Sequence, residues 1–145
     1  MGLCYMVDDI LDVAEWIQYA KEDYDGAVNT AKTQNPYSPR HVCYLCQQSA
    51  EKILKAYMIA KEGSRVKEHD LEKLLRRCER HASDFNGLTG ACSALDAYIT
   101  KTRYPSGLKL TESDMNHALK VASQILEFTI QKLKALGYSP VSPPS

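Results

Sequence analysis

Hydrophobic residues recur every three or four positions along five stretches of the chain, which is the spacing of amphipathic helices. In the first stretch, Asp8 or Asp9 would cap a helix that continues to about Lys32. Pro36 and Pro39 then prevent its continuation, because each proline restricts the residue before it. The stripe predicted to face the core consists of Ile10, Val13, Ala14, Ile17, Ala20, Tyr24, Ala27, Val28 and Ala31.

The second stretch predicts the helix around which the others are arranged. It is expected to begin with Ser38 as N-cap and Pro39 as first residue, and to end near Glu62 with Gly63 as C-cap. Its predicted apolar face consists of Cys46, Ala50, Ile53, Leu54 and Tyr57.

A polar stripe runs beside this apolar face. It consists of Gln47, Glu51 and Lys55, and Glu51 four residues before Lys55 is the favourable order for a helical ion pair. One interpretation is a solvated outer edge. The other is the wall of a binding site or of a dimer interface.

Three further helices follow. Asp70 can cap the third, Pro105 ends the fourth, and Thr111 with Asp114 forms a capping box that opens the fifth, which Gly137 closes. The apolar stripes of the three helices are Leu71, Leu74, Leu75 and Cys78; Leu88, Ala91, Cys92, Leu95, Tyr98, Ile99 and Thr102; and Met115, Ala118, Leu119, Ala122, Ile125, Leu126, Thr129 and Leu133.

Together these patterns predict an all-α fold, an up-down antiparallel bundle of four long helices plus one short helix. No segment alternates as a strand would. Residues 1–137 are expected to form a single domain, and residues 138–145, with three prolines and three serines, a disordered tail.

Composition narrows the function classes. The 145 residues carry 18 basic and 18 acidic side chains, so no net field attracts the chain to nucleic acid or membrane, and nucleic-acid contact requires a local patch. No apolar run reaches the roughly 18 residues of a membrane span, and the first residues lack the basic cluster of a signal peptide. We therefore expect a cytoplasmic protein without membrane contact.

Five scattered cysteines do not indicate a disulfide scaffold. Cys43 and Cys46 have the spacing of a metal or redox pair, but no second pair stands at zinc spacing. They are expected to be small hydrophobic core residues, and no metal or cofactor is predicted. No phosphate-binding glycine loop or serine-nucleophile motif occurs either.

Four stretches in order resemble the HEPN family (higher eukaryotes and prokaryotes nucleotide-binding domain), in its minimal stand-alone form. They are residues 16–24, 48–56, 69–71 and 98–105, and they cover roughly residues 8–136. The most specific is Gln48-Ser49-Ala50-Glu51-Lys52-Ile53-Leu54-Lys55-Ala56. The resemblance implies a helical bundle that dimerises and binds nucleotide or RNA. It also implies a small nucleotidyltransferase as partner in a toxin-antitoxin-like system.

Some members of that family are metal-independent endoribonucleases with an Arg followed, after four to six residues, by a His. After Arg103 the corresponding positions hold Leu108, Lys109 and Leu110. Arg76 and His81 have the formal spacing, but five residues of helix turn their side chains about 140° apart. A ribonuclease toxin using these two residues is therefore the alternative function, and the prediction leans toward a protein that is not an enzyme. A non-catalytic dimerisation or scaffold bundle is a third possibility.

The predicted nucleotide-binding residues centre on Arg103 and Tyr104. A guanidinium binds phosphate bidentately and a tyrosine ring stacks on a base, with Tyr98 as a second aromatic wall. Alternatively, Arg103 caps its own helix and Tyr104 packs the corner.

Three further residues are candidate helpers of this site. Lys52, Lys55 and His69 could line a groove for phosphate. As isolated side chains they would instead be a solvated face and the neighbour of a helix cap. Arg76, Arg77 and Arg80 form the best local basic patch for RNA, or else a salt-bridged surface.

Overall fold

The computed structural model describes residues 2–64, 66–103 and 109–140, with side chains at residues 12–64, 66–101 and 109–140. Within these residues the chain forms helices and no strand, which confirms the all-α prediction. The helices are α1 (Gly2–Lys32), α2 (Ser38–Glu62), α3 (Leu71–His81), the 3₁₀ helix η1 (Ser83–Leu88), α4 (Thr89–Arg103) and α5 (Glu112–Ala135).

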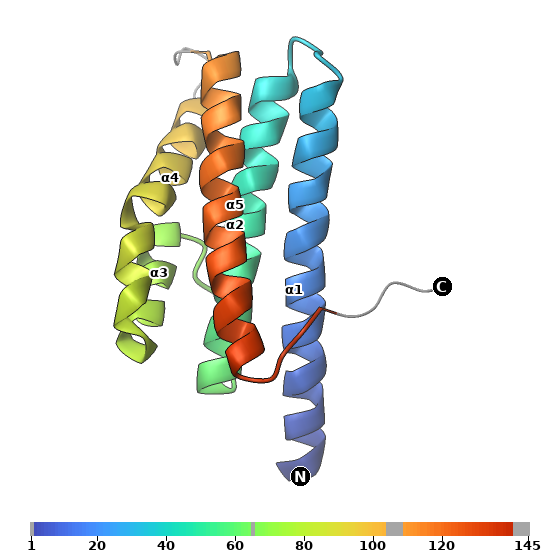
Figure 1. Ribbon diagram of the computed structural model, residues 1–145, viewed down its shortest axis with the longest axis vertical. Coiled ribbons are helices and arrows are strands. Elements are labelled where there is room, and N and C mark those ends of the chain that lie inside the picture. Colours follow the sequence, from blue (N-terminus) through green and yellow to red (C-terminus); the bar gives the residue numbers. More distant parts are fainter. Residues whose placement is uncertain (1, 65, 104–108, 141–145) are drawn as a thin grey trace.

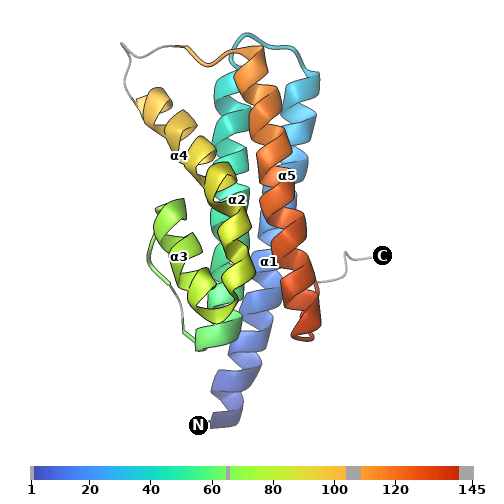
Figure 2. The ribbon, with the colours of Figure 1, turned by 60° about the vertical axis from the view of Figure 1, so that its left-hand side comes forward.

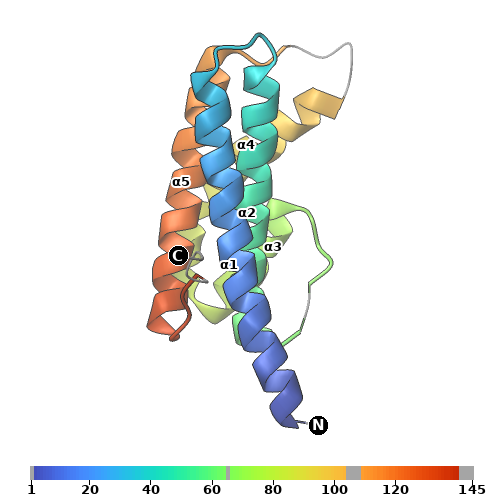
Figure 3. The same ribbon diagram turned by 90° about the vertical axis from the view of Figure 1, so that its right-hand side faces the viewer.

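The long helices lie side by side as a bundle (Figure 1). Helices α1 and α4 run in one direction and α2 and α5 in the other, while α3 lies beside the first half of α4 (Figure 2). The first turns of α1 project beyond the other helices (Figure 3). In the part of the chain that is described, no helix is long and apolar enough to cross a membrane.

Helix α2 is the centre of the bundle, because it contacts each of the other four α-helices. Its apolar side chains, including Cys46, Ile53 and Leu54, are fully buried. The contact with α1 is close enough for the buried Ser49 hydroxyl to donate a hydrogen bond to the Ala20 carbonyl oxygen, at 2.7 Å.

Two predicted helix starts are wrong. Helix α1 begins at Gly2, upstream of the proposed caps Asp8 and Asp9, because residues 2–8 contain no proline and continue the helical pattern. Ser38 is the first residue of α2 and Tyr37 is its N-cap. The Ser38 hydroxyl donates instead to the Thr30 carbonyl oxygen of α1, at 3.3 Å, because the turn brings it back to that helix.

The predicted ends at Gly63, Asp70 and Thr111 are confirmed, whereas Pro105 lies outside the described residues. Gly63 has a φ of 68° and its N–H donates to the Ile59 carbonyl oxygen, as a C-cap glycine does. The Asp70 carboxylate accepts the Lys73 N–H at 3.1 Å, and the capping box of Thr111 and Asp114 is present in full.

The chain continues in ordered contact after α5. Gly137 has a φ of 93°, and its N–H donates to the Lys134 carbonyl oxygen at 2.9 Å. Tyr138, which we assigned to the tail, packs against the core, so the folded unit extends beyond residue 137. Residues 141–145 lie outside the described part.

The 3₁₀ helix η1 was not predicted, because its sequence Ser83-Asp84-Phe85-Asn86-Gly87-Leu88 has turn residues and no helical period. It nevertheless supplies a central core residue. The Phe85 ring is fully buried, with centroids 4.6 Å from Tyr57 of α2 and 5.0 Å from Phe128 of α5. Its tilted and edge-on contacts join three elements of the fold.

We therefore expect Phe85→Ala to lower the free energy of unfolding by roughly 3–5 kcal/mol, because the lost ring leaves a cavity between α2 and α5. Urea denaturation followed by circular dichroism measures this loss. Tyr19→Ala, at an exposed aromatic of α1, is the matched control and should change the free energy by less than about 1 kcal/mol. Equal effects of the two substitutions would show that η1 is not part of the core.

Candidate functional site

A groove of about 490 Å³ follows one side of α2, between that helix, the segment before α3 and helix α4. Four of its residues, Arg40, Tyr44, Gln47 and Glu51, are separated by three or four positions and therefore share one face of α2. The full lining is Arg40, Tyr44, Gln47, Gln48, Glu51, His69 and Ile99.

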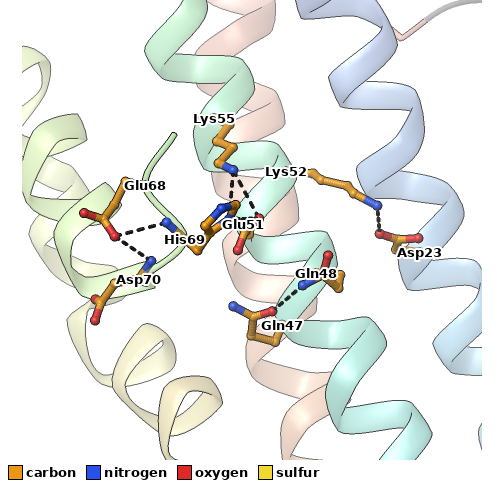
Figure 4. Close-up of polar contacts among 9 residues, drawn as sticks. All are labelled: Asp23, Gln47, Gln48, Glu51, Lys52, Lys55, Glu68, His69 and Asp70. Carbon is orange, nitrogen blue, oxygen red and sulfur yellow. Dashed lines mark hydrogen bonds and ion pairs between the residues drawn. The ribbon is translucent and has the colours of Figure 1, made fainter. Parts of the chain in front are cut away.

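At the floor of the groove, Glu51 forms a buried ion pair with Lys55, which lies behind it and does not line the groove. Glu51 and Lys55 are only 6% and 5% exposed, and the Lys55 Nζ lies 3.2 Å from the Glu51 Oε2. The His69 Nδ1 lies 3.3 Å from the same oxygen and 3.4 Å from the Lys55 Nζ (Figure 4). On its other side, the Lys55 ammonium lies 5.8 Å from the centroid of the Trp16 ring of α1.

This arrangement excludes one of the interpretations of the polar stripe. Gln47, Glu51 and Lys55 are all buried, so a solvated outer edge is wrong for these residues. The reason is that α1, α3 and α4 pack around α2 on several sides and leave it little surface. Burying two charges is costly, and the pair is stabilised because each charge has the other and a third polar or aromatic partner.

The rim of the groove combines an aromatic ring, a cation and amides. Tyr44 is 54% exposed, and Arg40 precedes it by one helical turn and is also exposed. The Gln48 Nε2 donates to the Gln47 Oε1 at 2.8 Å, so the two amides form one unit along the wall. Such a surface offers stacking, a phosphate contact and hydrogen bonds within a short distance.

Lys52 does not join this groove. Its ammonium lies 2.5 Å from the Asp23 Oδ2 of α1, and Figure 4 shows the side chain pointing toward that helix. Of the predicted helper residues, the structure therefore brings Lys55 and His69 together and directs Lys52 elsewhere.

The residues predicted around Arg103 are placed only in part. Arg103 is the last residue of α4, four positions after Ile99, and its side chain lies outside the described part, as does Tyr104. Tyr98 contacts α5, because its hydroxyl lies 2.8 Å from the His117 Nδ1. Among the described residues, the groove lining does not include Tyr98.

Arg76 and His81 lie on different sides of α3. Arg76 lines a small hollow with Glu72, Glu79 and Thr89, among other residues. The His81 Nε2 lies 3.1 Å from the Glu62 Oε2 of α2. The two side chains are therefore not brought together in one described site.

Part of the basic patch on α3 is a salt-bridged surface. The Arg77 guanidinium donates to Glu62 at 2.6 Å. Burial raises the pKa of the Glu62 carboxyl, but hydrogen bonds from His81 and Arg77 outweigh this effect and lower it below the usual value.

The cysteine pair is part of the core. Cys43 and Cys46 are fully buried free thiols, and burial raises the pKa of each to about 12. A thiol with such a pKa carries almost no thiolate at neutral pH, so both behave as small hydrophobic residues.

Asp96 of α4 lies near the start of α3. Burial and the nearby Asp70 carboxylate raise its pKa from 3.8 to about 6, although the backbone N–H groups of Glu72 and Leu71 lower it. His69 lies immediately before this helix start, so Asp96 is close to the far wall of the groove.

Two features of this region were missed by sequence reasoning. The position of Asp96 beside the start of α3 requires α3 and α4 to be adjacent, which no local signal reports. A second hollow of about 640 Å³ lies where the α1–α2 turn meets the start of α5, with Val28, Pro36, Met115 and Leu119 among its residues. It contains none of the predicted site residues. The groove itself could have been found from the spacing of Arg40, Tyr44, Gln47 and Glu51.

Comparison with known proteins places these features in context. The family profile described as the HEPN domain matches residues 13–133. Among solved structures, TT1696 from Thermus thermophilus is similar with a TM-score of 0.69 and 24% identity, over 81% of this chain and 94% of that one. ST0689, an archaeal HEPN homologue, gives a TM-score of 0.66 and 23% identity, over 83% and 97% of the two chains. At these identities the structures show a shared fold. The comparison with curated proteins finds no match.

The raised pKa of Asp96 generates a testable prediction. A carboxyl whose pKa is about 6 when folded and about 3.9 when unfolded favours the folded state fully below pH 4. This contribution is lost as the pH rises through 6, and it amounts to about 1–2 kcal/mol because solvent screens the partly exposed group. Asp96→Asn keeps an acceptor oxygen but does not titrate, so it should gain stability relative to wild type between pH 4.5 and pH 7. Urea midpoints at the two pH values measure the difference.

The matched control is Asp25→Asn, at an exposed carboxylate of α1. Its urea midpoint should change with pH as the midpoint of wild type does, across the same pH interval. If the Asp96→Asn curve is parallel as well, the carboxylate is not protonated in the folded protein at pH 5.

Proposed function

The chain belongs to the HEPN domain family, and on that premise we propose that it is a nucleotide- or RNA-binding module whose ligand occupies the groove beside α2. The observation that carries the proposal is the lining of this groove. Tyr44 and Arg40 stand exposed on its rim, and polar groups of Gln47, Glu51 and His69 line the rest of it. The groove lies within the segment matched by the family.

The side chains of the groove match the chemical groups of a nucleotide. The exposed Tyr44 ring offers a face on which a base can stack, an interaction that contributes about 1–3 kcal/mol per base. Arg40 offers a guanidinium for bidentate contact with phosphate. The buried Lys55 and the exposed His69 hold Glu51 in place at the other end. The groove therefore holds a base and a phosphate in a fixed relative position.

Arg103 and Tyr104 complete the proposed site from the side of α4. Ile99 of that helix lines the groove, and Arg103 follows it by one helical turn. In this proposal, Arg103 adds a second phosphate contact and Tyr104 a second aromatic surface. Lys52 and Tyr98 act indirectly, because they hold α1 and α5 through Asp23 and His117.

The proposal assigns binding and no catalytic step. The alternative of an endoribonuclease requires Arg76 and His81 to act on one phosphate. Their different surroundings, the hollow beside Glu72 for Arg76 and the Glu62 carboxylate for His81, do not favour that role.

We further propose that the protein acts as a homodimer, with a small nucleotidyltransferase as partner in a toxin-antitoxin-like system. The support is the family membership and the resemblance of residues 48–56 and 98–105 to the family. A module that binds a nucleotide without altering it needs a second protein for any chemistry, and a nucleotidyltransferase acts on the same class of ligand.

Nucleotide binding is testable by the thermal unfolding midpoint at low salt, with nucleoside monophosphates or short single-stranded RNA added. A ligand at one hundred times its dissociation constant should add about 2.7 kcal/mol to the free energy of unfolding. Tyr44→Ala should weaken binding by about tenfold or more, because the stacking surface is lost. Arg40→Ala should also weaken binding and reduce its salt dependence.

Tyr19→Ala and Lys21→Ala are the matched controls, since both side chains are exposed and lie outside the groove. They should bind as wild type does. If no nucleotide or RNA shifts the midpoint, the proposed function is wrong.

The assembly is testable by multi-angle light scattering of the purified protein, alone and mixed with a nucleotidyltransferase encoded beside it. We expect twice the monomer mass of 16.3 kDa and a further, larger species in the mixture. A monomer mass at micromolar concentration would contradict the homodimer. An unchanged mass in the mixture would contradict the nucleotidyltransferase partner.

A further inference from the structure

The groove beside α2 has a hydrogen-bond acceptor at one end and a cation at the other. We propose that this groove selects guanine nucleotides, because the Glu51 carboxylate accepts hydrogen bonds from the N1–H and the N2 amino group of the base. This inference rests on the proposed nucleotide-binding function. The selection follows from the contacts of Glu51, from the amides beside it and from the length of the groove.

Glu51 keeps one oxygen for a ligand. Lys55 and His69 both contact its Oε2 (Figure 4). Within the described part of the chain, the Oε1 accepts no hydrogen bond and is accessible to solvent. Because Glu51 lines the groove, this oxygen is an acceptor available to a base. Lys55 and His69 fix its direction, so it is preorganised for a donor.

A carboxylate discriminates between bases by their donors. Guanine presents two adjacent donors on its Watson–Crick edge, the N1–H and the N2 amino group, and both can donate to the two lone pairs of the one oxygen, Oε1. Adenine presents an acceptor at N1 next to its amino group, and uracil places its single N–H between two carbonyl oxygens. These acceptors would face Glu51 and lose hydrogen bonds, which is costly in a buried site.

The neighbouring amides complement the other edge of guanine. The Gln47 Oε1 is occupied by the Gln48 amide, so the Gln47 amino group remains the donating end of this pair. Guanine offers acceptors at O6 and N7. A base that donates to Glu51 can therefore accept from Gln47, which lies one helical turn away on the same face of α2.

The charges set the orientation of the nucleotide. The Glu51 carboxylate neutralises Lys55 and repels phosphate from the floor of the groove. Arg40, about 16 Å from Glu51 along the axis of α2 at 1.5 Å per residue, attracts phosphate at the other end. Tyr44 lies between them, where it can stack on the base. One nucleotide thus spans the groove with its base at Glu51.

Calorimetric titration of the full chain with GMP, IMP, AMP and UMP at low salt tests this assignment. IMP differs from GMP only by the absence of the N2 amino group, so it removes one hydrogen bond to a charged acceptor. We expect GMP to bind about tenfold or more tightly than IMP, and AMP and UMP to bind more weakly than IMP. Equal affinities for GMP and IMP would overturn the selection of guanine and leave nucleotide binding standing.

A variant series assigns the effect to Glu51. In Glu51→Gln, the preference for GMP over IMP should fall to less than about twofold. The reason is that a glutamine amide whose NH₂ group faces the base cannot accept a hydrogen bond from the N2 amino group. Glu15→Gln, at an exposed residue of α1, should keep the preference of wild type. If a folded Glu51→Gln protein still prefers GMP over IMP, another residue recognises the N2 amino group and the proposal is wrong.

The comparison of nucleotides on the wild-type chain does not depend on the folding of any variant. If none of the four nucleotides binds, the proposed function fails and the selection of guanine fails with it. If all four bind equally, only the selection fails. The two inferences are therefore separated by the same titration.

Discussion

The burial of Glu51 and Lys55 inside the bundle is the constraint on which the site depends. Two charges that are almost fully removed from water persist only when each is satisfied, and here the Lys55 ammonium has Glu51, His69 and the Trp16 ring around it. These partners come from α1, α2 and the segment before α3. The ion pair therefore couples three parts of the chain, and it fixes the direction of one carboxylate at the edge of the groove.

The position of His69 depends in turn on how α3 begins. Asp70 caps that helix, because its carboxylate accepts the Lys73 N–H. Asp96 of α4 lies near the same helix start, where burial and the Asp70 carboxylate raise its pKa. Helices α3 and α4 are in contact, so both border the segment that carries His69. The same helix α4 ends at Arg103, so its placement governs both ends of the proposed site.

Much of the fold was predictable, because periodicity and caps are local properties of the chain. The stripes of α2, α3 and α5, the Asp70 cap and the capping box at Thr111 all follow from residues a few positions apart. The failures have local causes too. The 3₁₀ helix η1 carries no helical period, and a helix start such as that of α1 is ambiguous where nothing forbids further turns. Of the residues predicted for the site, Lys55 and His69 lie together, while Lys52 pairs with Asp23 of α1.

The sequence by itself therefore determined the helices, their order and the family, because each rests on neighbouring residues or on motifs in register. Only the tertiary structure decided which polar residues of α2 are buried. Lys52 and Lys55 are three positions apart on one helix, yet the first pairs with Asp23 of α1 and the second with Glu51 and His69. Their different roles are set by partners 29 and 14 residues away in the chain. Such partners become neighbours only when the helices pack, because no periodicity within α2 records what lies opposite each face.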